Sequence, residues 1–145
     1  MDTKVEMTKP TIDELEMLNP FELWDLLINE VYKVFPDVQR IHDLIAVGCP
    51  IDPRDSLGRT ALYCAAISGN FDVVIFLVSK GADIDTGDIN GCTPLHLAAR
   101  CGWIDGVRFL TSKGADIHAR TNYGSTAWDF ASMKFRETCP ELEPK

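Results

Sequence analysis

The sequence predicts an all-α protein built as a solenoid, in which antiparallel helix pairs joined by hairpin loops stack in a row. Three observations predict this class. The chain repeats itself every 33 residues, each repeat contains two short helical apolar patterns, and glycines separate those patterns at matching positions. One such helix pair cannot cover its own apolar face, so neighbouring pairs must stack to make a core.

The repeat is clearest when residues 55–87 are aligned with residues 88–120. The two segments are identical at 17 of 33 positions. Further steps of the same length recover weaker matches in both flanks, including Gly48 and Gly124. We therefore divide the chain into a polar segment at 1–18, a divergent N-terminal capping repeat at 19–54, repeats at 55–87 and 88–120, and a truncated C-terminal capping repeat with a tail at 121–145.

Each repeat is interpreted as two helices followed by a hairpin. In the second repeat, Thr93 and Pro94 supply a helix N-cap and a proline at the first helical position, where the missing N–H would have no partner anyway. Gly102 ends this helix, and a second helix with a buried apolar stripe follows. Gly114 ends the second helix before the chain enters an extended turn.

The N-terminal cap is predicted to contain a longer first helix. Asn19 and Pro20 mark the start of a helix over residues 21–34, and Pro36 precedes another over residues 38–47. The segment before them is polar, and we expect about the first ten residues to be disordered.

The C-terminal unit is shorter than a full repeat. It has room for an inner helix from Thr126 to about Phe135, but Cys139 and Pro140 interrupt the outer helix. This pattern fits either a minimal C-terminal cap or a stack that continues with further repeats in a longer protein.

The charge pattern narrows the function. The formal charge is −8, and residues 1–48 contribute −6 of it, which disfavours non-specific attraction to nucleic acid or to an anionic bilayer. No secretory signal pattern or membrane-spanning apolar run is present, and the five cysteines show no disulfide framework. We expect an intracellular protein, cytoplasmic or nuclear, that is monomeric alone and has free thiols.

Residues 91–102, Gly-Cys-Thr-Pro-Leu-His-Leu-Ala-Ala-Arg-Cys-Gly, and the Lys-Gly-Ala-Asp-Ile runs at 80–84 and 113–117 resemble the ankyrin repeat. The resemblance implies a scaffold, adaptor or regulatory protein that binds other proteins and is not an enzyme. It also implies that His96 ties adjacent helix starts together by hydrogen bonds. Tyr63 and Asp129 stand at the position of this histidine in the neighbouring units.

Cys92, His96 and Cys101 suggest two chemical alternatives. A structural zinc site needs about four convergent ligands, and no second cluster accompanies these three residues. A thiol enzyme using Cys101 and His96 would need a stabilised thiolate and an oxyanion site, for which the sequence shows no motif. We expect no catalytic residue, no metal and no cofactor.

The resemblance places the partner site on the hairpin tips and the exposed side of the inner helices, which together form a concave groove. Leu57, Ile89 and Tyr123 would be apolar side chains at loop tips, as in contact hot spots. Basic residues accompany them, which favours a partner protein with an acidic or phosphorylated segment and an apolar anchor. The alternative is a nucleic acid or another polyanion in the same groove. The candidate partner-binding residues are Arg54, Leu57, Arg59, Ile67, Ile89, Asn90, Arg100, Trp103, Arg120, Asn122, Tyr123 and Lys134.

Overall fold

The computed structural model describes residues 9–145, and this part of the chain contains helices and loops but no strand. The sequence predicts disorder for about the first ten residues. Residues 1–8, most of that segment, lie outside the described residues. The helices are α1 (Ile12–Glu16), α2 (Pro20–Val31), α3 (Val38–Ala46), α4 (Ala61–Ser68), α5 (Phe71–Ser79), α6 (Pro94–Arg100), α7 (Ile104–Ser112), α8 (Ala127–Phe130), α9 (Met133–Thr138) and the 3-10 helix η1 (Pro140–Leu142).

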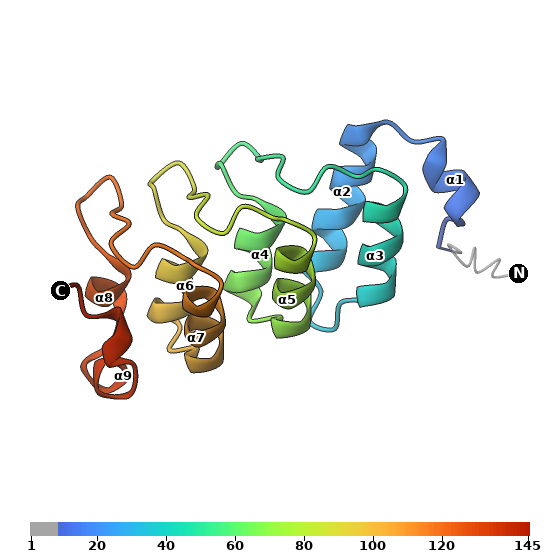
Figure 1. The fold of residues 1–145 in the computed structure, drawn as a ribbon. Coiled ribbons are helices and arrows are strands. Elements are labelled where there is room, and N and C mark those ends of the chain that lie inside the picture. Colours follow the sequence, from blue (N-terminus) through green and yellow to red (C-terminus); the bar gives the residue numbers. More distant parts are fainter. Residues whose placement is uncertain (1–8) are drawn as a thin grey trace, which may run out of the picture.

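The helices stack as the sequence predicts. Inner helices α2, α4, α6 and α8 contact one another in that order, and α3, α5 and α7 each pack on the inner helix before them (Figure 1). The three hairpin loops, which precede α4, α6 and α8, project from the same side of the stack, at the N-terminal ends of these inner helices (Figure 1). Buried side chains form one continuous cluster from Leu15 to Leu142. The prediction of an all-α solenoid is confirmed.

Three inner helices begin after a buried threonine at the same repeat position. Thr60, Thr93 and Thr126 all have extended backbone angles and precede α4, α6 and α8. The Thr60 hydroxyl accepts a hydrogen bond from the backbone N–H of Tyr63 at 3.2 Å. Such a cap satisfies an N–H that has no partner inside the helix.

The hairpin loops are ordered by the residue that starts each tip. One carboxylate oxygen of Asp55 accepts from the backbone N–H groups of Leu57 and Arg59 at 2.9 and 2.8 Å. Gly58 follows with φ +73°, and a Cβ there would lie 2.9 Å from the backbone nitrogen of Ile89. The left-handed backbone and the close approach of the next loop both require glycine at this position.

Hydrogen bonds also join each loop to the next. The backbone N–H of Ile89 donates to the carbonyl of Leu57 at 3.0 Å, and that of Asn122 donates to Asn90 at 2.8 Å. Before the tips, in the segments that follow α5 and α7, the carboxylate of Asp85 accepts from the backbone N–H of Asp116 at 2.9 Å. These bonds restrain the three tips relative to one another.

Helix α1 was not predicted from the sequence. The Thr11 hydroxyl and the Glu14 carboxylate form a reciprocal capping box, and Leu15 is fully buried against the first helix pair. Lys9 pairs with Asp37 at 2.7 Å. One buried leucine and a capping box are too short a signal to show helical periodicity in the sequence.

Helix α2 ends earlier than predicted, at Val31 instead of residue 34. The side-chain amide of Asn70 donates to the carbonyl of Val31 at 3.1 Å and to that of Lys33 at 3.3 Å. Pro36 also disfavours helical backbone at the residue before it. Val34 and Phe35 therefore lie in the α2–α3 loop and are exposed.

The C-terminal unit also differs from the prediction of one inner helix from Thr126 to about Phe135. Helix α8 stops at Phe130, Ala131 is extended, and the Ser132 hydroxyl caps α9 by accepting from the backbone N–H of Phe135 at 3.2 Å. Serine competes well for a cap position, so it starts a second helix at the point where the prediction continued the first.

We expect Asn19→Ala to lower the free energy of unfolding by about 1 kcal/mol, because it removes the α2 cap. The Asn19 side-chain oxygen accepts from Phe21 and Glu22 at 3.0 Å, and the Glu22 carboxylate accepts from the Asn19 N–H at 2.9 Å. Urea denaturation followed by far-UV circular dichroism measures the effect. Asn29→Ala, an exposed change within the same helix, is the control, and equal stability of the two variants would contradict the assignment.

Candidate protein-binding surface

The hairpin tips carry the most distinctive predicted residues. Leu57, Ile89 and Tyr123 are 46%, 57% and 83% exposed, and each lies on a loop held by the hydrogen bonds described above. Asn90 is exposed beside Ile89, and Ile67 is exposed near the end of α4. Exposed apolar side chains therefore lie at three successive tips.

Asn122 has a structural role within this surface. Its side-chain amide donates to the carbonyl of Ile89 at 2.9 Å, while its backbone N–H donates to Asn90. The second and third tips are thus joined through one residue, although Asn122 itself stays exposed.

Two of the five basic residues among the candidate partner-binding residues form contacts within the loops. The Arg54 Nε donates to the Gly58 carbonyl at 3.0 Å, and its guanidinium also donates to the Gly87 carbonyl in the next loop. Arg59 forms an ion pair with Asp55 at 2.7 Å. Asp55 therefore neutralises Arg59, whereas Arg54 keeps its charge but is held by carbonyl groups of two loops.

Arg100 and Arg120 remain available as cations. Both are exposed, and neither forms an ion pair within residues 9–145. Arg120 donates to the Gly124 carbonyl at 2.7 Å, which orients its side chain beside the third tip. Lys134 lies in α9 instead of at the end of an inner helix, because α8 stops at Phe130.

Trp103 belongs to a different part of the molecule. It lies in the α6–α7 loop, at the opposite end of the helices from the hairpin tips, and is partly buried. Its ring meets that of Phe71 edge to face, with centroids 5.5 Å apart. The predicted grouping of Trp103 with the tip residues is therefore wrong, since its aromatic face packs between repeats.

His96 forms the contacts that the family resemblance implies. Its Nδ1 accepts from the backbone N–H of Thr93 at 3.1 Å, and its Nε2 lies 3.0 Å from the carbonyl of Ser125 in the next loop. Burial lowers the pKa of His96. Both ring nitrogens are occupied, so the geometry does not offer His96 as a base for Cys101.

Tyr63 also connects its own helix to the following hairpin loop, but through a side-chain hydroxyl instead of an imidazole. Its hydroxyl donates to the Asp88 carboxylate at 2.9 Å, which links α4 to the start of the second tip. Asp129 instead accepts from the backbone N–H of Thr126 at 2.8 Å and caps its own helix.

The cysteines are free thiols, and Cys101 is the exposed one. Burial raises the pKa of Cys49 to about 11 and raises the pKa values of Cys64 and Cys92 as well. Within residues 9–145, no three His, Cys, Asp or Glu side chains gather as metal ligands would. No helix in this range is long and apolar enough to cross a bilayer.

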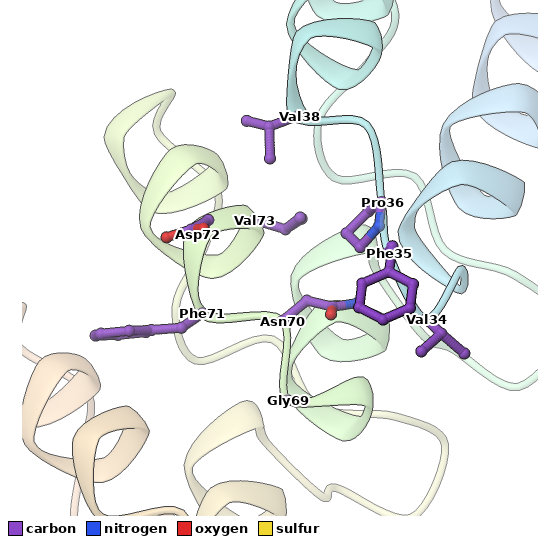
Figure 2. Close-up of a pocket in the computed structure, with 9 residues that line it drawn as sticks. All are labelled: Val34, Phe35, Pro36, Val38, Gly69, Asn70, Phe71, Asp72 and Val73. Carbon is purple, nitrogen blue, oxygen red and sulfur yellow. The ribbon is translucent and has the colours of Figure 1, made fainter.

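A concavity of about 300 Å³ lies at the end of the helices opposite the hairpin tips. It was not predicted from the sequence. It lies between the α2–α3 and α4–α5 loops, and Val34, Phe35 and Phe71 contribute to its lining (Figure 2). The predicted continuation of α2 through Val34 hid this feature. Because α2 ends at Val31, Val34 lies in the α2–α3 loop beside Phe35.

The fold and the ordered tips define a class: a repeat protein that presents a preformed surface along a row of stacked helix pairs. A family model described as ankyrin repeats (3 copies) matches residues 32–121. The chain belongs to the ankyrin-repeat family, and ankyrin repeats are protein–protein interaction modules. No curated protein matches it.

Proposed function

We propose that this protein binds a partner protein through the tip surface, defined as Leu57, Ile89, Asn90, Tyr123 and Arg120 on the hairpin loops, together with Arg100 at the last residue of the inner helix α6. The observation that carries the proposal is the row of exposed apolar side chains on hydrogen-bonded loops. Ordered loops lose little conformational entropy on binding, so a few apolar anchors suffice for useful affinity. A solvated loop tip without a partner would not need such side chains at successive repeats.

The charge of the tip surface favours an acidic or phosphorylated segment in the partner. Arg100 and Arg120 are exposed and lack ion pairs in the described part of the chain. A guanidinium can form two parallel hydrogen bonds with a carboxylate or phosphate. The partner would therefore combine an apolar anchor for Tyr123 or Ile89 with an acidic group for these arginines.

A peptide array tests this proposal. The full chain is offered acidic and phosphorylated peptides that each contain one large apolar residue, and binding is quantified by fluorescence anisotropy. We expect Tyr123→Ala combined with Arg100→Glu to weaken binding by about a hundredfold. Arg108→Glu makes the same charge change on the outer helix α7 and should leave affinity within about threefold of wild type.

Unchanged peptide affinity in the double variant would refute the proposal that the tip surface binds the partner. A naked oligonucleotide serves as competitor, and steeply salt-dependent binding of that oligonucleotide in preference to the peptides would favour the polyanion alternative.

A further inference from the structure

The second and third hairpin tips each lie beside a preceding tip that accepts their hydrogen bonds. The backbone N–H of Ile89 donates to the Leu57 carbonyl of the first tip at 3.0 Å. The backbone N–H of Asn122 donates to the Asn90 carbonyl of the second tip at 2.8 Å, and the Asn122 side-chain amide donates to the Ile89 carbonyl at 2.9 Å. One face of a tip thus receives the carbonyl groups of a neighbouring turn.

The first tip presents the equivalent face to a cavity. Ser56 stands 33 residues before Ile89, at the same position of the repeat. It is exposed, and neither its backbone N–H nor its hydroxyl forms a hydrogen bond within residues 9–145. A cavity of about 640 Å³ lies between the first turns of α2 and this loop, and Ser56 is one of its lining residues. Two donors of Ser56 are therefore accessible to an occupant of the cavity.

The other walls of the cavity are largely apolar. Phe21, in the first turn of α2, is 73% exposed, and Pro20, Pro50 and Pro53 extend the apolar lining. The volume is in the range of sites that hold small ligands or short peptide segments. An apolar side chain of an occupant can pack on these walls while the backbone of the same occupant reaches Ser56.

The charged residues of the cavity do not favour either sign in an occupant. Asp25 and Arg54 both line it, one acidic and one basic. Asp55, also in the lining, is neutralised by its ion pair with Arg59, and the Arg54 guanidinium is held by two loop carbonyls. We therefore expect an uncharged occupant, bound by backbone hydrogen bonds and apolar packing.

We propose that this cavity is a second binding site, which takes an uncharged turn of a partner protein. Two successive backbone carbonyls of that turn accept from the N–H and the hydroxyl of Ser56, in the arrangement that Asn122 already makes with the second tip. An apolar side chain of the turn packs on Phe21. The site uses no residue of the tip surface, so it does not depend on the function proposed above.

The probe is a cyclic peptide that copies residues 87–92, because this turn already presents its carbonyls to a neighbouring tip. The changes Asp88→Asn and Cys92→Ser remove its charge and its thiol. An NMR titration of the full chain follows the backbone amide resonance of Ser56, which belongs to the proposed donor. We expect a saturable shift of this resonance with a dissociation constant of about 1 mM.

Ser56→Pro removes the proposed donor and leaves the loop intact. The Gly58 N–H donates to the Asp55 carbonyl at 2.9 Å, which places Ser56 at the second position of a β-turn, where proline is favoured. The midpoint of thermal unfolding should therefore equal or slightly exceed that of wild type. Peptide binding, followed through the amide resonance of Leu57, should weaken about fivefold. Ser56→Ala keeps the N–H and should weaken binding about twofold at most.

Further variants separate this site from the tip surface. Phe21→Ala should weaken the cyclic peptide about fivefold, whereas Phe35→Ala, at an aromatic side chain 89% exposed outside this cavity, should bind it as wild type does. Tyr123→Ala combined with Arg100→Glu should also bind it as wild type does. Raising the salt concentration from about 0.05 to 0.5 M should change the dissociation constant less than about twofold.

Four results would overturn the proposal. The first is that the cyclic peptide produces no saturable shift of the Ser56 resonance. The second is that Ser56→Pro and Phe21→Ala bind the peptide as tightly as Ser56→Ala and Phe35→Ala do. The third is a Ser56 shift that appears when the protein alone is concentrated, which would place a second copy of the chain in the cavity. The fourth is binding that weakens steeply with salt, which would indicate a charged occupant.

Discussion

Gly106→Val should destabilise the protein by about 3 kcal/mol, because the indole of Trp103 occupies the space where a side chain at position 106 would lie. A Cβ added at Gly106 would be 2.0 Å from Cε3 of Trp103. The ring cannot simply move aside, since it also packs edge to face on Phe71. Phe71 in turn contacts Phe109, so the clash reaches the packing between α5 and α7.

The preceding repeat contains the control for this prediction. Its equivalent positions hold Asn70 and Val73, a smaller residue in the loop with a larger one in the helix. We therefore expect Trp103→Asn to relieve part of the cost of Gly106→Val, so that the double variant is more stable than the sum of the single changes implies. Urea denaturation of the four proteins measures the coupling. Strict additivity, or wild-type stability of Gly106→Val, would contradict it.

His96→Ala should cost about 3 kcal/mol of the free energy of unfolding. The imidazole is buried and connects the Thr93 helix start with the Ser125 carbonyl of the next loop. Its removal leaves those two backbone groups without their partner and opens a cavity. The exposed His42→Ala is the control and should stay within about 0.5 kcal/mol of wild type.

The same histidine makes stability depend on pH. Burial lowers the pKa of His96 in the folded protein, so the folded state binds this proton less readily than the unfolded chain does. Its stabilising contribution is complete above the unfolded pKa of about 6.5 and declines as the pH falls from there toward the lower folded pKa. Thermal unfolding between about pH 7.5 and 5.5 measures the decline.

His42→Ala should keep this pH dependence, whereas His96→Ala should largely lose it. An equally steep decline in His96→Ala would assign the proton uptake to another group. Protonation acts at Nδ1, which accepts from Thr93 in the folded protein and can no longer do so once it carries a proton.

Helix starts and loop tips followed closely from the sequence because short-range chemistry determines them. The Thr60 hydroxyl caps α4, and the Asp55 carboxylate orders the first tip, through backbone groups within a few residues. Gly58 supplies the left-handed backbone of the same tip. The exposed apolar side chains at the tips could be predicted for the same reason. The helix ends were less predictable where a distant residue supplied the cap, as Asn70 does for the end of α2.

The contacts of the candidate partner-binding residues could not be predicted from residue types alone. Arg54 and Arg59 look like cations available to a partner, but their guanidinium groups are used by the loop carbonyls and by Asp55. Trp103 looks like a binding aromatic, but the missing side chain of Gly106 makes room for it between repeats. Some of these contacts are local, because Asp55 is four residues from Arg59 and Gly106 is three residues from Trp103. The contacts of Arg54 with Gly87 and of Trp103 with Phe71 come instead from the packing of another repeat.

The sequence by itself determined the all-α solenoid, its period and its family, because a repeated pattern of caps, apolar stripes and glycines is local and recurs in every unit. Tertiary structure alone decided the contacts between repeats, such as those of Arg54 with Gly87 and of Trp103 with Phe71. It also created the cavity of about 640 Å³ that Pro20, Phe21 and Trp24 of α2 line together with Pro50 and Pro53, which lie about thirty residues later in the chain. Those properties depend on which surfaces meet when the chain folds, and the repeat pattern does not contain that information.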